Sequence, residues 1–115
     1  MKLERRILVV VDVCKLIVGV LLRGVLGVEH VEIFSSCEEL KEFLASKKGV
    51  AGEINCVLPV NDACVDRVRE ARVEVVNIIG IPRRLRREVY EAIHLAVEVG
   101  ARARAGMIEV LRADK

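Results

Sequence analysis

The amino-acid sequence predicts an α/β domain: a doubly wound, Rossmann- or receiver-like, four-stranded parallel sheet with a long C-terminal helix. Short runs rich in Val, Ile and Leu alternate with helical patterns along residues 1–81, which we assign to the α/β domain. The first run, residues 6–13, is apolar almost throughout, as in a strand buried on both faces. An amphipathic pattern follows at residues 82–115, which we assign to a C-terminal helix and tail.

Three further apolar runs complete the predicted sheet. They lie at residues 31–34, 55–60 and 73–81, and Pro59 stands near the end of the second, where a missing hydrogen-bond donor matters little. The alternation of strands and helices predicts right-handed β-α-β connections between parallel strands.

Capping signals place the intervening helices. Ser36 and Glu39 fit a capping box that opens a helix with Leu40 and Leu44 on its apolar face. Asn61 or Asp62 is expected to cap the next helix. Pro82 stands in the first turn of the last helix, where it costs little stability.

Residues 18–27, VGVLLRGVLG, are open to three interpretations. Gly19 and Gly24 have the spacing of a phosphate-binding loop, but Val25 and Leu26 stand where that motif requires Lys and Ser or Thr. Residues 16–28 are too few to span a membrane, and they include Arg23. We therefore expect an apolar helix that covers the sheet.

The C-terminal pattern predicts an unusually long helix. A helix over residues 83–112 would be about 45 Å long at 1.5 Å per residue, whereas a strand of five or six residues spans about 17–20 Å. Such a helix would extend past the sheet and need another partner. The alternative is a break at Gly100 or Gly106, with residues 107–111 as a short extra strand or helix. The apolar stripe of this helix comprises Leu85, Val89, Ala92, Ile93, Ala96 and Val97.

Composition restricts the class of protein. Arg and Glu are abundant and Gln, Thr and Trp are absent, a bias reported for hyperthermophiles, so we expect a thermophilic source. The net charge of +2 does not by itself indicate nucleic-acid binding. We see no signal peptide, because the first residues lead directly into a strand pattern, and we expect a cytoplasmic protein without direct membrane insertion.

Two carboxylates are candidate metal ligands. Asp12 ends the first predicted strand and Asp62 follows the third, so both are expected at the carboxyl edge of a parallel sheet, where such folds bind ligands. Together they could hold Mg²⁺. However, the second acidic residue and the lysine of a receiver site are not identifiable, and Asp62 is explained equally as a helix cap. We therefore expect no cofactor.

The four cysteines do not have zinc-site spacing, and the two histidines are far apart in the sequence. In a parallel sheet Cys14 and Cys37 would follow adjacent strands, and we consider a disulfide between them, with buried free thiols as the alternative. Cys56 and Cys64 are expected to be unpaired.

The basic cluster at residues 83–87 could contact phosphate groups. Aromatic residues for base stacking are scarce, and Glu88 and Glu91 offer ion pairs within the helix, so a solvated or partner-facing surface is favoured over nucleic-acid binding. No pair of nucleophile and base is recognisable, so we expect no catalytic activity.

Several segments, taken in order, resemble the small globular subunit on the central stalk of archaeal and vacuolar-type rotary ATPases. The family has a strand ending in an acidic residue and then a G-x-x-L-x-G-V segment, matched here by Asp12 and residues 19–25. An acidic helix opening of two glutamates followed by apolar residues is similar to residues 38–44, and a strand ending in Ile-Pro matches Ile81 and Pro82.

The resemblance implies a non-catalytic central-stalk (rotor) component of a proton-translocating ATP synthase or ATPase. Its C-terminal helix would lie along the coiled coil of the stalk, and the predicted partner-binding residues are Arg84, Leu85, Val89, Ile93 and Val97. Two alternatives remain open. One is a self-associating regulatory or ligand-sensing domain whose last helix packs on a second copy. The other is a nucleic-acid-binding module that uses Arg83–Arg87.

Overall fold

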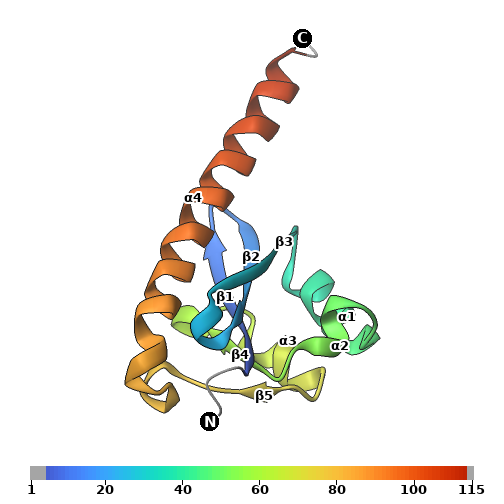
Figure 1. Cartoon of the computed structure of the whole chain (residues 1–115). Helices are drawn as coiled ribbons and strands as arrows, with labels where there is room; N and C mark the ends of the chain where they lie inside the picture. Colours follow the sequence, from blue (N-terminus) through green and yellow to red (C-terminus); the bar gives the residue numbers. More distant parts are fainter. Residues whose placement is uncertain (1–4, 114–115) are drawn as a thin grey trace.

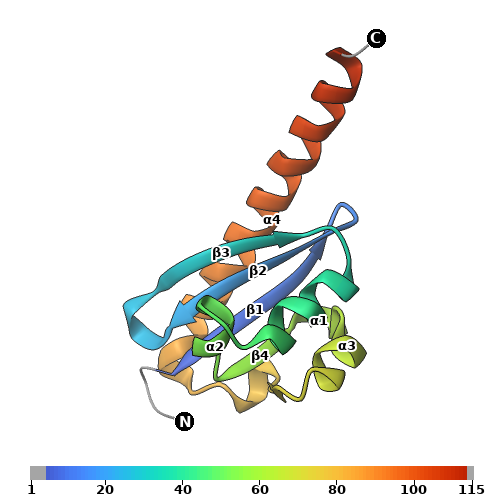
Figure 2. The same cartoon turned by 90° about the vertical axis from the view of Figure 1, so that its right-hand side faces the viewer.

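The fold is mixed α/β, with an open five-stranded sheet and a long C-terminal helix (Figures 1 and 2). The computed structural model describes residues 5–113 and the side chains of residues 5–106. The strands are β1 (Arg6–Val13), β2 (Leu16–Arg23), β3 (Val28–Phe34), β4 (Cys56–Pro59) and β5 (Glu74–Val75). The α-helices are α1 (Cys37–Ser46), α2 (Val50–Glu53), α3 (Val65–Glu70) and α4 (Arg83–Ala113), and 3₁₀ turns cover Gly24–Leu26, Val60–Asp62 and Ile78–Gly80.

The sheet is mixed, so the expectation of four parallel strands is wrong. Its order is β3-β2-β1-β4-β5; β1, β2 and β3 form an antiparallel meander, while β4 and β5 run parallel to β1. The mixed topology arises at Cys14 and Lys15, which both have positive φ (50° and 67°). Two such residues form the type I′ turn that suits a tight hairpin, so the chain reverses directly into β2.

Residues 16–23 are therefore the second strand and not a helix covering the sheet. Alternate side chains of β2 enter two cores: Val18, Val20 and Leu22 face α4, while Ile17 and Leu21 face α1 and α3. A strand buried on both faces is apolar at every position, and its periodicity does not distinguish it from a buried helix.

Gly19 has a packing role in β2. A Cβ at this position would lie 3.1 Å from Leu8 Cδ1 and 3.5 Å from Phe34 Cε2. The missing side chain thus makes room for Leu8 and Phe34 between the sheet and α1. At the end of β2 the chain turns through Gly24 and Gly27, whose positive φ values (52° and 89°) suit glycine.

The other predicted strands are present with altered bounds. The first extends over Arg6–Val13 as expected, while residues 31–34 belong to the longer β3 and residues 55–60 contain β4. The last is reduced to the two residues of β5, followed by a 3₁₀ turn in which Asn77 accepts a hydrogen bond from the Gly80 amide.

The predicted start of α1 is confirmed, although the Glu39 carboxylate bonds Ser35 and not the Ser36 amide of a standard capping box. The Ser36 hydroxyl accepts a hydrogen bond from the Glu39 amide at 3.2 Å, and the Glu39 carboxylate accepts one from the Ser35 amide at 2.7 Å. The Ser35 hydroxyl also donates to this carboxylate, and the two bonds from Ser35, the hydroxyl contributing more, lower the pKa of Glu39. The helix packs Leu40 and Leu44 against the sheet.

Helix α4 is continuous from Arg83 to Ala113, so the long helix is confirmed and the alternative, a break at Gly100 or Gly106, does not occur. Its first half covers one face of the sheet, and α1 and α3 cover the other (Figures 1 and 2). At Gly100 the helix touches the β1–β2 hairpin so closely that a Cβ would lie 2.7 Å from Val13 Cβ. Beyond this contact it projects away from the sheet (Figure 1).

Among residues 5–113, no helix is long and apolar enough to cross a membrane.

Candidate functional site

The carboxyl ends of β1 and β4 bring Asp12 and Asp62 to one place. Both line a hollow of about 460 Å³ together with the loop that follows β4. The chain moves to opposite sides of β1 as it forms β2 and then β4, so this hollow lies where open α/β sheets bind ligands. The mixed topology leaves this juxtaposition intact because β1 and β4 are parallel neighbours.

The loop after β4, which carries Asp62, has an unusual backbone conformation. Asn61, Asp62 and Cys64 all have positive φ, between 51° and 59°. Residues other than glycine seldom adopt a positive φ. Where they do, the strained backbone often belongs to a functional loop. The expectation that Asn61 or Asp62 caps the next helix is wrong: the residue before α3 is Cys64, and no side chain caps the helix.

The hollow lacks the donors of a conventional protein metal site. Within the part of the chain that the structure describes, no three His, Cys, Asp or Glu side chains are grouped to hold a metal ion. Asp12 and Asp62 remain two exposed carboxylates beside Asn61.

Of the predicted partner-binding residues of α4, some are buried in the fold and others are exposed. Leu85 and Val89 are fully buried among residues of the sheet, and Ile93 is partly buried against the same core. Arg84 is exposed, and Val97 is 46% exposed. Leu85 and Val89 are therefore core residues that a partner does not reach in this structure, because the sheet occupies the face predicted to bind it.

The outer face of α4 carries the accessible apolar groups of this helix. Tyr90 is 60% exposed and borders a hollow of about 690 Å³, which is lined by Arg87, Tyr90, Glu91, His94, Leu95 and Glu98. A second hollow, of about 330 Å³, lies between Tyr90 and Ile93 of α4 and the loop after β4.

The basic cluster at the start of α4 is partly engaged within the chain. Arg86 donates a hydrogen bond to the Ile81 carbonyl oxygen at 3.3 Å, and Arg87 pairs with Glu91 at 3.1 Å. Arg83 and Arg84 are accessible at the surface. Because Arg86 and Arg87 make these contacts within the chain, fewer arginines of the cluster are available to contact phosphate.

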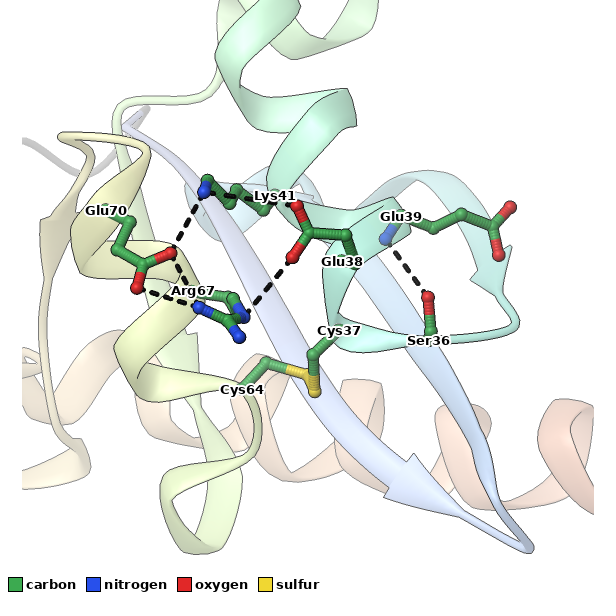
Figure 3. A network of polar contacts seen from close by, with 8 residues as sticks. All are labelled: Ser36, Cys37, Glu38, Glu39, Lys41, Cys64, Arg67 and Glu70. Carbon is green, nitrogen blue, oxygen red and sulfur yellow. Dashed lines mark hydrogen bonds and ion pairs between the residues drawn. A yellow bond between two sulfur atoms is a disulfide. The ribbon is translucent and has the colours of Figure 1, made fainter.

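The disulfide joins Cys37 to Cys64, so the predictions that pair Cys14 with Cys37 and leave Cys64 unpaired are wrong (Figure 3). The two α carbons are 5.3 Å apart, at the starts of α1 and α3. Cys14 instead lies in the exposed β1–β2 hairpin turn. The usable sequence signal was the position of Cys37 and Cys64, each next to the start of a helix that follows a strand.

Ion pairs that join α1 to α3, and one within α3, lie beside this disulfide (Figure 3). Lys41 contacts Glu70 at 3.0 Å, and Arg67 contacts Glu38 at 3.3 Å and Glu70 at 2.8 Å. The hydrogen bonds from Lys41 and Arg67 lower the pKa of Glu70. Exposed pairs of this kind contribute little stability individually, so the disulfide is the stronger link of the two.

Thiol labelling tests the cysteine arrangement. We expect iodoacetamide to modify the native, unreduced protein at Cys14 alone, because Cys14 is exposed while Cys37 and Cys64 are bonded. Cys56 is buried, and its desolvation raises its pKa to about 11, so it has little reactive thiolate. Peptide mass spectrometry locates the label, and denaturation without reduction should add Cys56. Labelling of Cys37 or Cys64 in the unreduced protein would contradict the pairing.

Comparisons with protein-family models, curated proteins and solved structures found no match to this chain.

Proposed function

We propose that this chain is a non-catalytic subunit of a protein assembly and that the projecting part of α4 is its docking element. The observation that carries the proposal is the length of α4. The helix contacts the β1–β2 hairpin closely at Gly100 and continues to Ala113. At 1.5 Å per residue, those last 13 residues add about 20 Å of helix beyond the hairpin.

The beginning of the projecting segment favours close packing against another helix. Ala101 and Ala105 lie one turn apart on one side of the helix, and Arg102 and Arg104 lie on either flank of that side. Small residues allow two helix backbones to approach, while arginines at the border of a contact select an acidic partner. A helical extension that projects from its domain gains little stability from its own chain, so a partner helix accounts for its presence.

Charge adds to this preference. Residues 83–113 include seven Arg and four Glu, a net charge of +3 for the helix, whereas the whole chain has a net charge of +2. The rest of the chain is therefore slightly acidic, and the positive charge is concentrated on α4. We infer that the partner is a helical protein with an acidic face.

The specific assembly that we propose is the central stalk of an archaeal-type rotary ATPase, where a coiled coil would be the partner. The acidic opening of α1 and the Ile81-Pro82 step before α4 support this choice. The docking residues differ from those predicted from sequence. Because Leu85 and Val89 are buried in the chain's own core, we place the contact at Val97 and the segment from Ala101 onward.

Charge reversal on the projecting segment tests the proposal. A tagged chain expressed in the source organism should recover rotary-ATPase stalk subunits, identified by mass spectrometry. We expect Arg102→Glu with Arg104→Glu to reduce that recovery about tenfold or more, because like charges then face an acidic partner. Both side chains lie beyond the close contact at Gly100, so the variant should fold normally.

The matched control reverses Lys47 and Lys48, which are exposed in the loop after α1. It makes the same change in net charge and should leave recovery unchanged. Absence of ATPase subunits with the unaltered chain would contradict the stalk role, and full recovery with the Arg102/Arg104 variant would contradict docking through α4.

Self-association through α4 is the second candidate. The exposed Tyr90 and Val97 favour it, because both lie on the part of α4 that covers the sheet and face away from the core. Light scattering distinguishes the candidates: a dimer dissociated by Tyr90→Arg supports self-association through this face.

A further inference from the structure

The two edges of the sheet are protected to different degrees. At one edge β5 has only two residues, and short edge strands discourage pairing with another chain. At the other edge β3 has seven residues without proline or lysine, and a bulge at Glu29, opposite Leu21 and Leu22 of β2, leaves residues 30–34 regularly paired. Figure 2 shows β3 along the outer side of the sheet, next to β2. The backbone groups of β3 that point away from β2 are therefore a template for another strand.

Exposed apolar side chains gather at the same edge. Among the side chains that the structure describes, four of the seven exposed large apolar ones lie in or just before β3: Val25, Leu26, Val28 and Ile33, with Leu26 the most exposed of the four at 65%. Val31 is only partly buried against the core under α4. An apolar group of this kind beside an open edge is typical of a surface that binds a partner.

The polar residues of β3 favour one particular pairing. His30 and Glu32 lie two residues apart on the same face and contact each other at 2.5 Å. In an antiparallel pair of two β3 strands centred on Val31, His30 of each copy lies opposite Glu32 of the other. The imidazole and carboxylate contact that exists within one strand would then also form across the two strands, twice.

Other alignments place unfavourable groups opposite each other. Centring an antiparallel pair on Glu32 brings two carboxylates together, and centring it on His30 places Glu32 opposite Val28. A parallel pair in register stacks Glu29 on Glu29 and Glu32 on Glu32. Like charges directly opposite each other destabilise a sheet, so the charges of β3 disfavour these alignments while permitting the one centred on Val31.

We propose that β3 pairs antiparallel with β3 of a second copy of this chain, centred on Val31, and joins the two sheets into one. This surface is separate from the projecting segment of α4, so the proposal goes beyond the assembly role described above. The dimer leaves the projecting segment of each α4 free, and it presents two docking helices to a partner.

A charge exchange tests the pairing in the full chain. Light scattering should give twice the chain mass of 12.8 kDa for the unaltered protein. We expect His30→Glu to raise the dissociation constant about tenfold or more, because the new carboxylate at position 30 then faces Glu32 of the other copy, at two symmetric places. Adding Glu32→His should restore the dimer, since glutamate and histidine again lie opposite each other.

Two controls separate this interface from others. His94→Glu makes the same substitution at the chain's other histidine, which lies on α4, and should leave the dimer intact. Arg102→Glu with Arg104→Glu should also leave it intact, so loss of stalk recovery and loss of dimer are distinguishable. Circular dichroism confirms that each variant is folded.

A monomer at every accessible concentration would overturn the proposal. So would a dimer that His30→Glu leaves unchanged, or a doubly substituted chain that is folded but remains monomeric.

Discussion

Replacing Leu85 with alanine is expected to lower the free energy of unfolding by about 2–5 kcal/mol. Leu85 is 1% exposed and packs in the core between α4 and the sheet, where truncation removes apolar contacts and leaves a cavity. Urea denaturation followed by circular dichroism measures the loss. The result also tests the position of α4, because a helix docked only on a partner would lose little stability from this change.

Val97→Ala is the matched control on the same helix. This side chain is 46% exposed, so we expect its loss to cost less than about 1 kcal/mol. Similar losses for the two variants would show that the first half of α4 does not pack on the sheet as described. A loss at Val97 that exceeds the loss at Leu85 would reverse the assignment of the buried face.

Removal of the Cys37–Cys64 disulfide is expected to lower the free energy of unfolding by about 3–4 kcal/mol. The bond joins residues 27 apart in sequence, and its absence restores conformational freedom mainly to the unfolded chain. For a domain of this size the melting temperature should fall by roughly 10–20 °C. Thermal unfolding of the chain with Cys37→Ser and Cys64→Ser measures the effect.

Cys14→Ser is the corresponding control, because Cys14 is an exposed free thiol. We expect a change within about 0.5 kcal/mol. A reducing agent should lower the melting temperature of the unaltered chain to that of the double variant and leave the double variant unchanged. Equal stability of oxidised and reduced protein would contradict a structural role for this bond.

Local signals in the sequence predicted several elements correctly. The capping box at Ser36 and Glu39 placed the start of α1. The length of the amphipathic pattern predicted that the last helix extends past the sheet. These features depend on hydrogen bonds and side-chain spacing within a few turns, so neighbouring residues are sufficient to specify them.

Local sequence patterns could not predict the second strand, because both of its faces are buried. Residues 16–23 have an apolar residue or glycine at every position before Arg23, and such a run fits a buried helix or a buried strand equally well. The deciding feature is the pair of positive φ values at Cys14 and Lys15. Neither residue type is usual in a tight hairpin turn, so the sequence carried no recognisable turn signal.

Some features of the candidate sites could likewise be predicted from the sequence, and others could not. Asp12 and Asp62 meet at one hollow because β1 and β4 are parallel, which the alternation of elements predicts. The cysteine pairing and the burial of Leu85 and Val89 depend on which elements become neighbours.

Local hydrogen bonding and periodicity are enough to specify most of the apolar strands and the start of α1, and they allow, without requiring, one long last helix. The packing of the whole chain is needed to turn β1 back into β2, to bring Cys37 to Cys64, and to bury the first half of α4 while its second half projects from the sheet. These outcomes follow from the packing of residues far apart in the chain, where burial on both faces of the sheet outweighs local preference.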